Sequence, residues 1–419
     1  MKSSRRFNDA LKRLVAGITL SASLSLPAQA LTQNIDASFR PDAANPQMNK
    51  FRNDTPISGV CEGHIPAQCK ALNIFTIRDT AFRATSIGPI LPGADLRNAA
   101  MFKVPSQWRP LAVTHQITGE VETVEVRIAG IGHRWDLPRP PGVSAWTLPG
   151  PPQIAWNRRW LDGVAPCVGT RYIAAGSSMV LFFWLVPENA GACGLAPGTE
   201  IPKFWYSHLE YAYELRTPNP LTMSTGNYTG SITYTMGPGQ DFDFGDVVIP
   251  ADNLYTFNFN LSVQHTLKVE VPPGGQRVEL LPQGGWQAWL NQGRKPTRLF
   301  RDQTFNLSAS SRFKMNLECQ YPSGNNCALW EPNAGHVVPL EVSVTLPSGL
   351  TDASNQPVNR RPLLRDGVGT ELFQPGIYVD RKPGTLHFEV PRDDVEEMIK
   401  QGTARHYSGN VTVIWDSQV

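Results

Sequence analysis

The sequence predicts an all-β protein built from two β-sandwich domains. Many short segments alternate between apolar and polar residues, which is the pattern of strands with one buried face. The 35 glycines and 36 prolines are spread along the chain, so turns recur at short intervals. Helix signals are few. Many short strands separated by turns are typical of sandwiches, and 419 residues are enough for two such domains.

The chain begins with a segment that predicts a secretory signal, residues 1–30. Basic residues precede an apolar run over residues 14–26, and small residues end at Ala30, after which we expect cleavage. The chain has a formal net charge of +2 and residues 1–30 contribute +4, so the remainder carries −2. Such a charge does not attract nucleic acid in general, and we predict no nucleic-acid partner.

The six cysteines fall into three close pairs. An even number of cysteines in an exported chain indicates disulfides, and pairing near neighbours closes the shortest loops. A zinc site is the alternative, but the CxxC and paired Cys/His spacings of zinc sites are missing. We therefore expect three disulfides: Cys61 with Cys69, Cys167 with Cys193, and Cys319 with Cys327.

The strands are expected where alternation is strict. The longest strongly apolar run after the signal, MVLFFWLV at residues 179–186, is far shorter than the ~20 residues of a membrane-spanning helix and predicts a buried strand. The best helix signal is PRDDVEEMIKQG at residues 391–402, with acidic residues in its first turn. Alternating strands are predicted at residues 121–130, 208–216, 254–263, 266–272 and 338–347.

Residues 133–163 combine tryptophans, arginines and prolines. Prolines place much of this passage in loops or at a sheet edge. Aromatic faces beside arginines suit stacking on sugars and capture of carboxylates, while the alternative is that the tryptophans are core and the arginines ordinary surface. The candidate receptor-binding residues from this passage are Arg134, Trp135, Arg158, Arg159 and Trp160.

Three aspartates lie close together in GPGQDFDFGD, residues 237–246. On a strand, Asp241 and Asp243 would share one face, a spacing open to glycosidase acid/base pairs or to Ca²⁺. The alternative is a solvated strand face or bend with Phe242 and Phe244 turned to the core, and the surrounding glycines favour it. No HExxH or GxSxG motif occurs. We therefore predict no catalytic residues, no metal and no cofactor.

A short similarity links the two halves: YTGSITY at residues 228–234 recurs as YSGNVTV at residues 407–413. The first copy is followed by residues 254–263, which can complete its sheet, whereas the second copy lies at the end of the chain. We expect the second domain to lack its last strand and to receive one from another chain. Residues 31–47 are not apolar enough to fill the gap in cis.

These features together resemble the CblD-like family of minor pilins, the fimbrial tip adhesins and assembly initiators of the alternate chaperone–usher pathway. The resemblance rests on the two close cysteine pairs of the first half, YTGSITYT followed by GQDFDFGD, TLKVEVPPGGQRVELLP at residues 266–282, and YSGNVTVIW at residues 407–415. It spans the chain after the signal and depends on the order and spacing of these segments rather than on any single motif.

The resemblance implies two immunoglobulin-like β-sandwich domains: an N-terminal adhesin domain, residues 31–264, and a C-terminal pilin domain, residues 265–419. The pilin domain would lack its last strand and have a groove that accepts a donor strand. It implies transit through the periplasm to a fimbrial tip on the cell surface. The implied partners are a periplasmic chaperone, an outer-membrane usher, the major pilin and a host glycan or glycoprotein. The strands expected to line the groove lie at residues 340–347, 386–391 and 410–415.

The family can use clustered arginines to bind sialylated receptors. Arg216 resembles one of these by position, although the family example has two adjacent arginines and this chain has Leu215 before it. A further family arginine has only Arg52 as a loose counterpart. Two other functions stay open: a secreted β-sandwich carbohydrate-active enzyme, and a structural minor pilin that binds no receptor.

Overall fold

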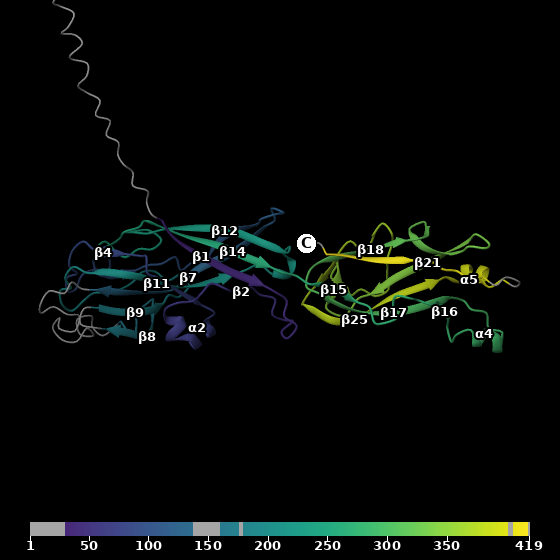
Figure 1. The fold of residues 1–419 in the computed structure, drawn as a ribbon. Coiled ribbons are helices and arrows are strands. Elements are labelled where there is room, and N and C mark those ends of the chain that lie inside the picture. The colour runs from purple at the N-terminus through teal and green to yellow at the C-terminus, as the bar shows by residue number, and fades with distance from the viewer. Residues whose placement is uncertain (1–29, 137–159, 176–178, 401–404, 418–419) are drawn as a thin grey trace, which may run out of the picture.

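The computed structural model describes residues 30–136, 160–175, 179–400 and 405–417. The protein is nearly all-β, as the alternating segments predict, and its two halves lie end to end (Figure 1). The predicted signal lies outside the described residues. No helix in the described part of the chain is long and apolar enough to cross a membrane. The helices are short: α1 Val60–Gly63, α2 Pro66–Leu72, α4 Gln287–Gln292 and α5 Arg392–Met398, with single 3-10 turns at Leu96–Asn98 and Pro220–Thr222.

In the first half, twelve of the described strands form one continuous sheet, and β5 and β10 form a small second one. This differs from the expected pair of separate sheets, because β7 changes partner along one of its edges. It pairs with β6 up to Val126 and with β9 from Gly130 onward, while β11 follows its other edge. The sheet therefore curls around one core. The strands are β1 Leu31–Phe39, β2 Arg52–Asn53, β3 Phe75–Asp79, β4 Ala84–Ser86, β5 Ala100–Phe102, β6 Arg109–His115, β7 Val121–Asp136, β8 Val168–Ala175, β9 Met179–Leu185, β10 Cys193–Leu195, β11 Trp205–Arg216, β12 Gly226–Thr235, β13 Val248–Pro250 and β14 Leu254–Val263.

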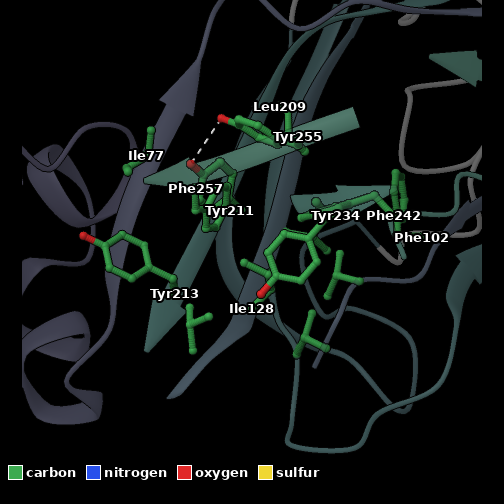
Figure 2. Close-up of a cluster of buried hydrophobic side chains, with 14 of the residues drawn as sticks. Ile77, Phe102, Ile128, Leu209, Tyr211, Tyr213, Tyr234, Phe242, Tyr255 and Phe257 are labelled. Carbon is green, nitrogen blue, oxygen red and sulfur yellow. Dashed lines mark hydrogen bonds between the residues drawn. The ribbon is translucent and has the colours of Figure 1, made fainter. Parts of the chain in front are cut away.

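The core of the first half is rich in aromatic rings. Figure 2 shows part of it, in which the hydroxyl groups of Tyr211 and Tyr255 lie 3.2 Å apart within hydrogen-bonding distance. Burial raises the pKa of Tyr211 well above its ordinary value, so this phenol stays protonated. β9, predicted from MVLFFWLV, is buried along most of its length. Alternation in β14 sends one face into this core: Tyr255, Phe257, Phe259, Leu261 and Val263.

β1 closes the first half along β14. It pairs with β14 in parallel from Leu31 to Phe39, and its residues Ile35, Ala37 and Phe39 are buried in the same core. The segment judged too polar to fill a groove in the second half is thus a strand of the first half. Most of its polar residues, Thr32, Asn34, Asp36 and Ser38, lie on the outer face, which is why its overall composition does not reveal a buried strand.

The second half is a sandwich of two sheets. An eight-stranded sheet has β15 at one edge, and a four-stranded sheet has the order β22-β24-β18-β26. Both sheets contribute to one core, for example Phe305 and Val342 from the first and Phe313 and Phe373 from the second. The strands are β15 Leu267–Glu270, β16 Leu281–Pro282, β17 Leu299–Ala309, β18 Phe313–Cys319, β19 Pro322–Ser323, β20 Asn326–Glu331, β21 His336–Thr345, β22 Leu350–Asp352, β23 Arg361–Pro362, β24 Phe373–Pro375, β25 Val379–Val390 and β26 Val411–Ser417.

The three expected disulfides are present. Cys61–Cys69 joins α1 to α2, Cys167–Cys193 joins the start of β8 to β10, and Cys319–Cys327 joins β18 to β20. The predicted helix is also present as α5, which follows Pro391 and buries Val395 in the second core. The short separation of the paired cysteines is enough to predict the disulfides, and the signals at the ends of residues 391–402 are enough to predict the helix.

Candidate functional site

The last described strand, β26, lies at the edge of its sheet. It pairs with β18 from Phe313 opposite Ser417 to Cys319 opposite Val411. Among the described residues, no second strand pairs with its other edge. The backbone N–H and C=O groups of that edge are therefore available to a strand from another chain.

The apolar side chains of β26 are only half-buried. Val411, Val413 and Trp415 alternate along one face and pack against the second core without being covered by it. The ring of Trp415 lies 5.0 Å from that of Phe305 and 5.7 Å from that of Phe313, measured between centroids. An apolar row beside a free edge offers both the backbone partners and the side-chain pockets that strand addition uses.

The edge strand of the opposite sheet carries a similar row. In β15, Leu267 and Val269 are half-buried and pack against the same core. Because β15 pairs with β17 and Trp415 contacts Phe305 of β17, the two half-buried rows flank the same part of the core. We call the two sets together the half-buried row: Leu267 and Val269 from β15, and Val411, Val413 and Trp415 from β26.

This row corrects part of the groove predicted from sequence. Of the three expected segments, residues 410–415 do lie at a free edge, but residues 340–347 and 386–391 belong to β21 and β25 in the interior of the eight-stranded sheet. Their inward side chains are core residues. The alternation of TLKVEVP predicts β15 as a strand, but nothing in the sequence places that strand at the groove.

The first half shows the contrast. Its last strand, β14, is paired on both edges, by β12 and by β1. The inward side chains of β14 are at most 2% exposed, whereas those of β26 are all half-buried. Two strands with similar alternating patterns therefore differ in whether a neighbour covers them.

The two described arginines of the candidate set, Arg134 and Arg216, lie far apart in this structure. Arg216 lies opposite Glu125, and Arg134 lies opposite His208, nine positions further along β7. That separation is roughly 30 Å. The guanidinium of Arg216 stacks on Trp108 at 3.9 Å from the ring centroid, and Arg134 donates to Asp136 at 2.9 Å. Both side chains are about half exposed, and their roles in receptor binding stay predictions.

The two described tryptophans of the candidate set belong to the core. Trp135 is 1% exposed and Trp160 is 2% exposed, and Trp160 packs against Phe182 and Trp184. Neither ring has a free face to stack on a sugar, so the expectation that they bind a receptor is wrong in this structure. Their burial follows from the adjoining strands β7 and β9. Arg158 and Arg159 lie outside the described residues.

The aspartate stretch forms a bend held by two arginines. Asp241 binds Arg109, and Asp243 and Asp246 both bind Arg97, at 3.0 and 2.6 Å. Phe242 and Phe244 are buried, as expected for a bend. Asp243 is buried too, where a solvated position was expected. Because Asp241 and Asp243 have different arginine partners, the arrangement does not resemble a paired acid and base.

Hydrogen bonds keep the carboxylates of Asp241 and Asp246 ionised. Burial raises the pKa of Asp241, but the hydrogen bonds from Arg109 and Thr235 outweigh it and leave the pKa below its ordinary value. The hydrogen bond from Arg97 lowers the pKa of Asp246. No group of three or more His, Cys, Asp and Glu side chains in the described part of the chain could hold a metal ion.

Comparisons with known proteins give distant matches only. No family model and no curated protein matches the chain. Three solved structures cover most of it. A chaperone–tip adhesin complex of CFA/I fimbriae is 11% identical over 93% of this chain and 97% of that chain, with a TM-score of 0.25. A mutant of CfaE, the CFA/I adhesin of enterotoxigenic E. coli, is 10% identical over 93% of each chain, also with a TM-score of 0.25.

The third structure is the CsuC–CsuE chaperone–tip subunit pre-assembly complex from the archaic Csu pili of Acinetobacter baumannii. It is 10% identical over 92% of this chain and 98% of that chain, with a TM-score of 0.22. Similarity at this level does not assign a function to the chain.

Proposed function

We propose that this protein is an exported, non-enzymatic tip subunit of a chaperone–usher fimbria that adheres to host glycans and initiates pilus assembly. Residues 31–264 would form the adhesin domain and residues 265–419 the pilin domain. His265 lies at the junction: its Nε2 is 2.9 Å from the carbonyl oxygen of Met223 and its Nδ1 is 3.2 Å from the hydroxyl of Ser310. The observation that carries the proposal is the free edge of β26 with its half-buried row.

Strand addition explains how such an edge works. A strand laid along β26 would form main-chain hydrogen bonds that do not depend on its sequence. Its alternate side chains would cover Val411, Val413 and Trp415, which gives specificity and removes apolar surface from water at roughly 25 cal/mol per Å². A chaperone would supply this strand in the periplasm, and the major pilin would replace it after delivery to the usher.

Other features support export and a free first half. The sequence predicts a secretory signal, and three disulfides suit an oxidising compartment. The first half has its last strand covered by its own β1, so it can present a receptor site while the second half is joined to a fibre. Arg216 and Arg134 remain candidates for that site.

The proposal predicts that the chain needs a strand donor. Residues 31–419 would be produced alone, and together with a periplasmic pilus chaperone or a peptide of the major pilin's N-terminal extension. We expect aggregation without a donor and a soluble complex with one, measured by size-exclusion chromatography and thermal unfolding. A soluble, monomeric and thermally stable chain without any partner would contradict strand acceptance.

A matched pair of variants locates the effect. Val413→Asp places a charge in the half-buried row, whereas Thr412→Asp places the same charge on the exposed face of β26. We expect Val413→Asp to reduce the recovered complex at least about tenfold, because a carboxylate there must be desolvated when the donor binds. Thr412→Asp should leave recovery nearly unchanged. Equal effects of the two variants would show that the donor does not bind along this face.

A further inference from the structure

The outer face of β1, β12 and β14 has an unusual composition. Along residues 32–38, 227–233 and 256–262, the outward positions of the three strands are all serine, threonine, asparagine or aspartate, and Asp36 is the one charged residue among them. Ordinary exposed surfaces carry about a quarter to a third Lys, Arg, Glu and Asp. Cross-strand register places these side chains in four rows, which we call the polar face: Thr233, Thr256 and Thr32; Ser231, Asn258 and Asn34; Thr229, Asn260 and Asp36; and Asn227, Ser262 and Ser38.

A cavity of about 350 Å³ opens at one end of the polar face. This volume is near the lower end of the ~300–1,000 Å³ of ligand pockets, which suits a ligand of monosaccharide size. None of the lining residues that the structure describes is a lysine or arginine. The polar side chains in the lining are Asp36, Ser38, Asp54, Gln116, Asn227, Thr229, Asn260 and Ser262.

The side chains at the cavity are held in place by neighbouring strands. The amide of Asn260 donates to a carboxylate oxygen of Asp36 at 2.8 Å, which fixes its orientation because a carboxylate only accepts. That bond uses one N–H and leaves the carbonyl oxygen and the second N–H of Asn260 for a ligand. The backbone N–H of Gln116 donates to the carbonyl oxygen of Asn227 at 2.9 Å, which ties the β6–β7 turn to β12 beside the cavity.

The carboxylate of Asp54 at the cavity remains an ionised acceptor. Burial raises the pKa of Asp54, but hydrogen bonds with Ser38 and Arg52 outweigh it and lower the pKa overall. Arg52 itself lies outside the lining and binds Asp54 at 2.8 Å. The cavity therefore offers amides that donate and accept, hydroxyls that do both, and carboxylates that accept.

We infer that this cavity binds a neutral, polyhydroxylated sugar residue. Vicinal hydroxyl groups donate and accept at once, which matches amides and carboxylates better than any other side chains here. An acidic sugar would place its carboxylate beside Asp36 and Asp54 without a lining cation to offset the repulsion. The inference rests on the proposed adhesive function and gives it a ligand class, neutral glycans, that the scattered arginines do not suggest.

The test is an array that pairs each neutral oligosaccharide with its sialylated form. The probe is the chain of residues 31–419, bound to its strand donor or alone if it is stable alone, so that strand capture and glycan binding are measured separately. We expect neutral members to bind and their binding to fall at least about tenfold in Asn260→Ala and in Asn227→Ala. Asn258→Ala is the matched control, because Asn258 also donates to β1, at Asn34, but lies outside the cavity.

Several results would overturn the inference while leaving strand acceptance intact. Binding confined to sialylated members would do so, and so would binding that Asn260→Ala and Asn227→Ala do not change. A chain that captures its donor normally but binds no glycan would also overturn it. A fall of equal size in Asn258→Ala would also count against the cavity, since it would indicate a general loss of the β1–β14 pairing.

Discussion

The residues that the sequence places in a loop or at a surface are sometimes core residues in the structure. Trp135 and Trp160 come from a passage whose prolines and arginines predict exposure, yet both rings pack in the first core. His133 is a similar case, with an imidazole that is wholly buried and stacks on Tyr206 at 4.4 Å between centroids. Composition describes a segment on average, whereas burial is decided separately for each side chain.

Acid sensitivity is expected from His133. Burial lowers its pKa to about 3, against ~6.5 in an unfolded chain. Below pH ~6.5 the unfolded chain binds a proton that the folded chain does not, so the free energy of unfolding falls as pH drops, until pH ~3. At pH ~5 this costs about 2 kcal/mol. Urea denaturation at pH 7 and pH 5 should show a smaller pH-dependent loss in His133→Gln than in the unchanged protein.

The exposed His406 provides the control for this measurement. His406→Gln should keep the full loss of stability between pH 7 and pH 5, because its imidazole is not desolvated. If His133→Gln loses as much stability over that interval as the unchanged protein does, the buried imidazole is not the source of the acid sensitivity.

At the scale of an element, the bend at residues 236–246 depends on Arg97. Two carboxylates share this guanidinium, but they differ in exposure: the side chain of Asp243 is 2% exposed and that of Asp246 is 49% exposed. Asp243 also accepts the backbone N–H of Gly245 at 2.9 Å, so its charge fixes the backbone of the bend. Removing the arginine would leave Asp243 buried without its cation.

Arg97→Ala should therefore lower the free energy of unfolding, because it leaves the buried carboxylate of Asp243 without its cation. Asp246→Asn removes the exposed partner alone and should lower the free energy of unfolding much less. Both values come from urea denaturation monitored by tryptophan fluorescence. Equal losses in the two variants would mean that Asp243 does not depend on Arg97.

At the scale of the whole molecule, the two halves differ in closure. Each contains an alternating strand late in its sequence, but among the strands that the structure describes β14 has neighbours on both edges and β26 has one. The first half should therefore be stable without a donor strand, whereas the second half should need one. This asymmetry suits a protein whose two halves meet different ligands.

Hydrogen exchange measures this difference directly. Amides of Leu254–Val263 should exchange at least about tenfold more slowly than those of Val411–Ser417 in the chain without a donor, because β26 has a free edge and half-buried side chains. Adding the strand donor should slow exchange in β26 and leave β14 unchanged. Slow exchange in β26 before any donor is added would mean that its edge is already covered.

Much of this architecture follows from local sequence patterns. Alternation predicts β11, β14 and β21 because burial of every second residue is a property of a single strand, and a short continuous apolar run predicts β9. The disulfides follow from short loops. Three features depend on distant contacts and were not predicted: β7 changes partners, β1 inserts beside β14, and β15 lies at an edge. The cavity could have been suspected, because the outward positions of residues 227–233 and 256–262 lack lysine, arginine and glutamate.

The disulfide between Cys319 and Cys327 has a mechanical consequence. A donor strand along β26 would form a row of hydrogen bonds with it. A force along the strand axis would act on all of these hydrogen bonds at the same time. β26 and β18 are paired at seven residue positions, and their hydrogen bonds would transmit the force to β18. At the end of β18, Cys319 carries it through a covalent bond to β20 in the eight-stranded sheet. If the protein is part of a fibre as proposed, this covalent link would resist sliding of the two sheets of the second half under tension.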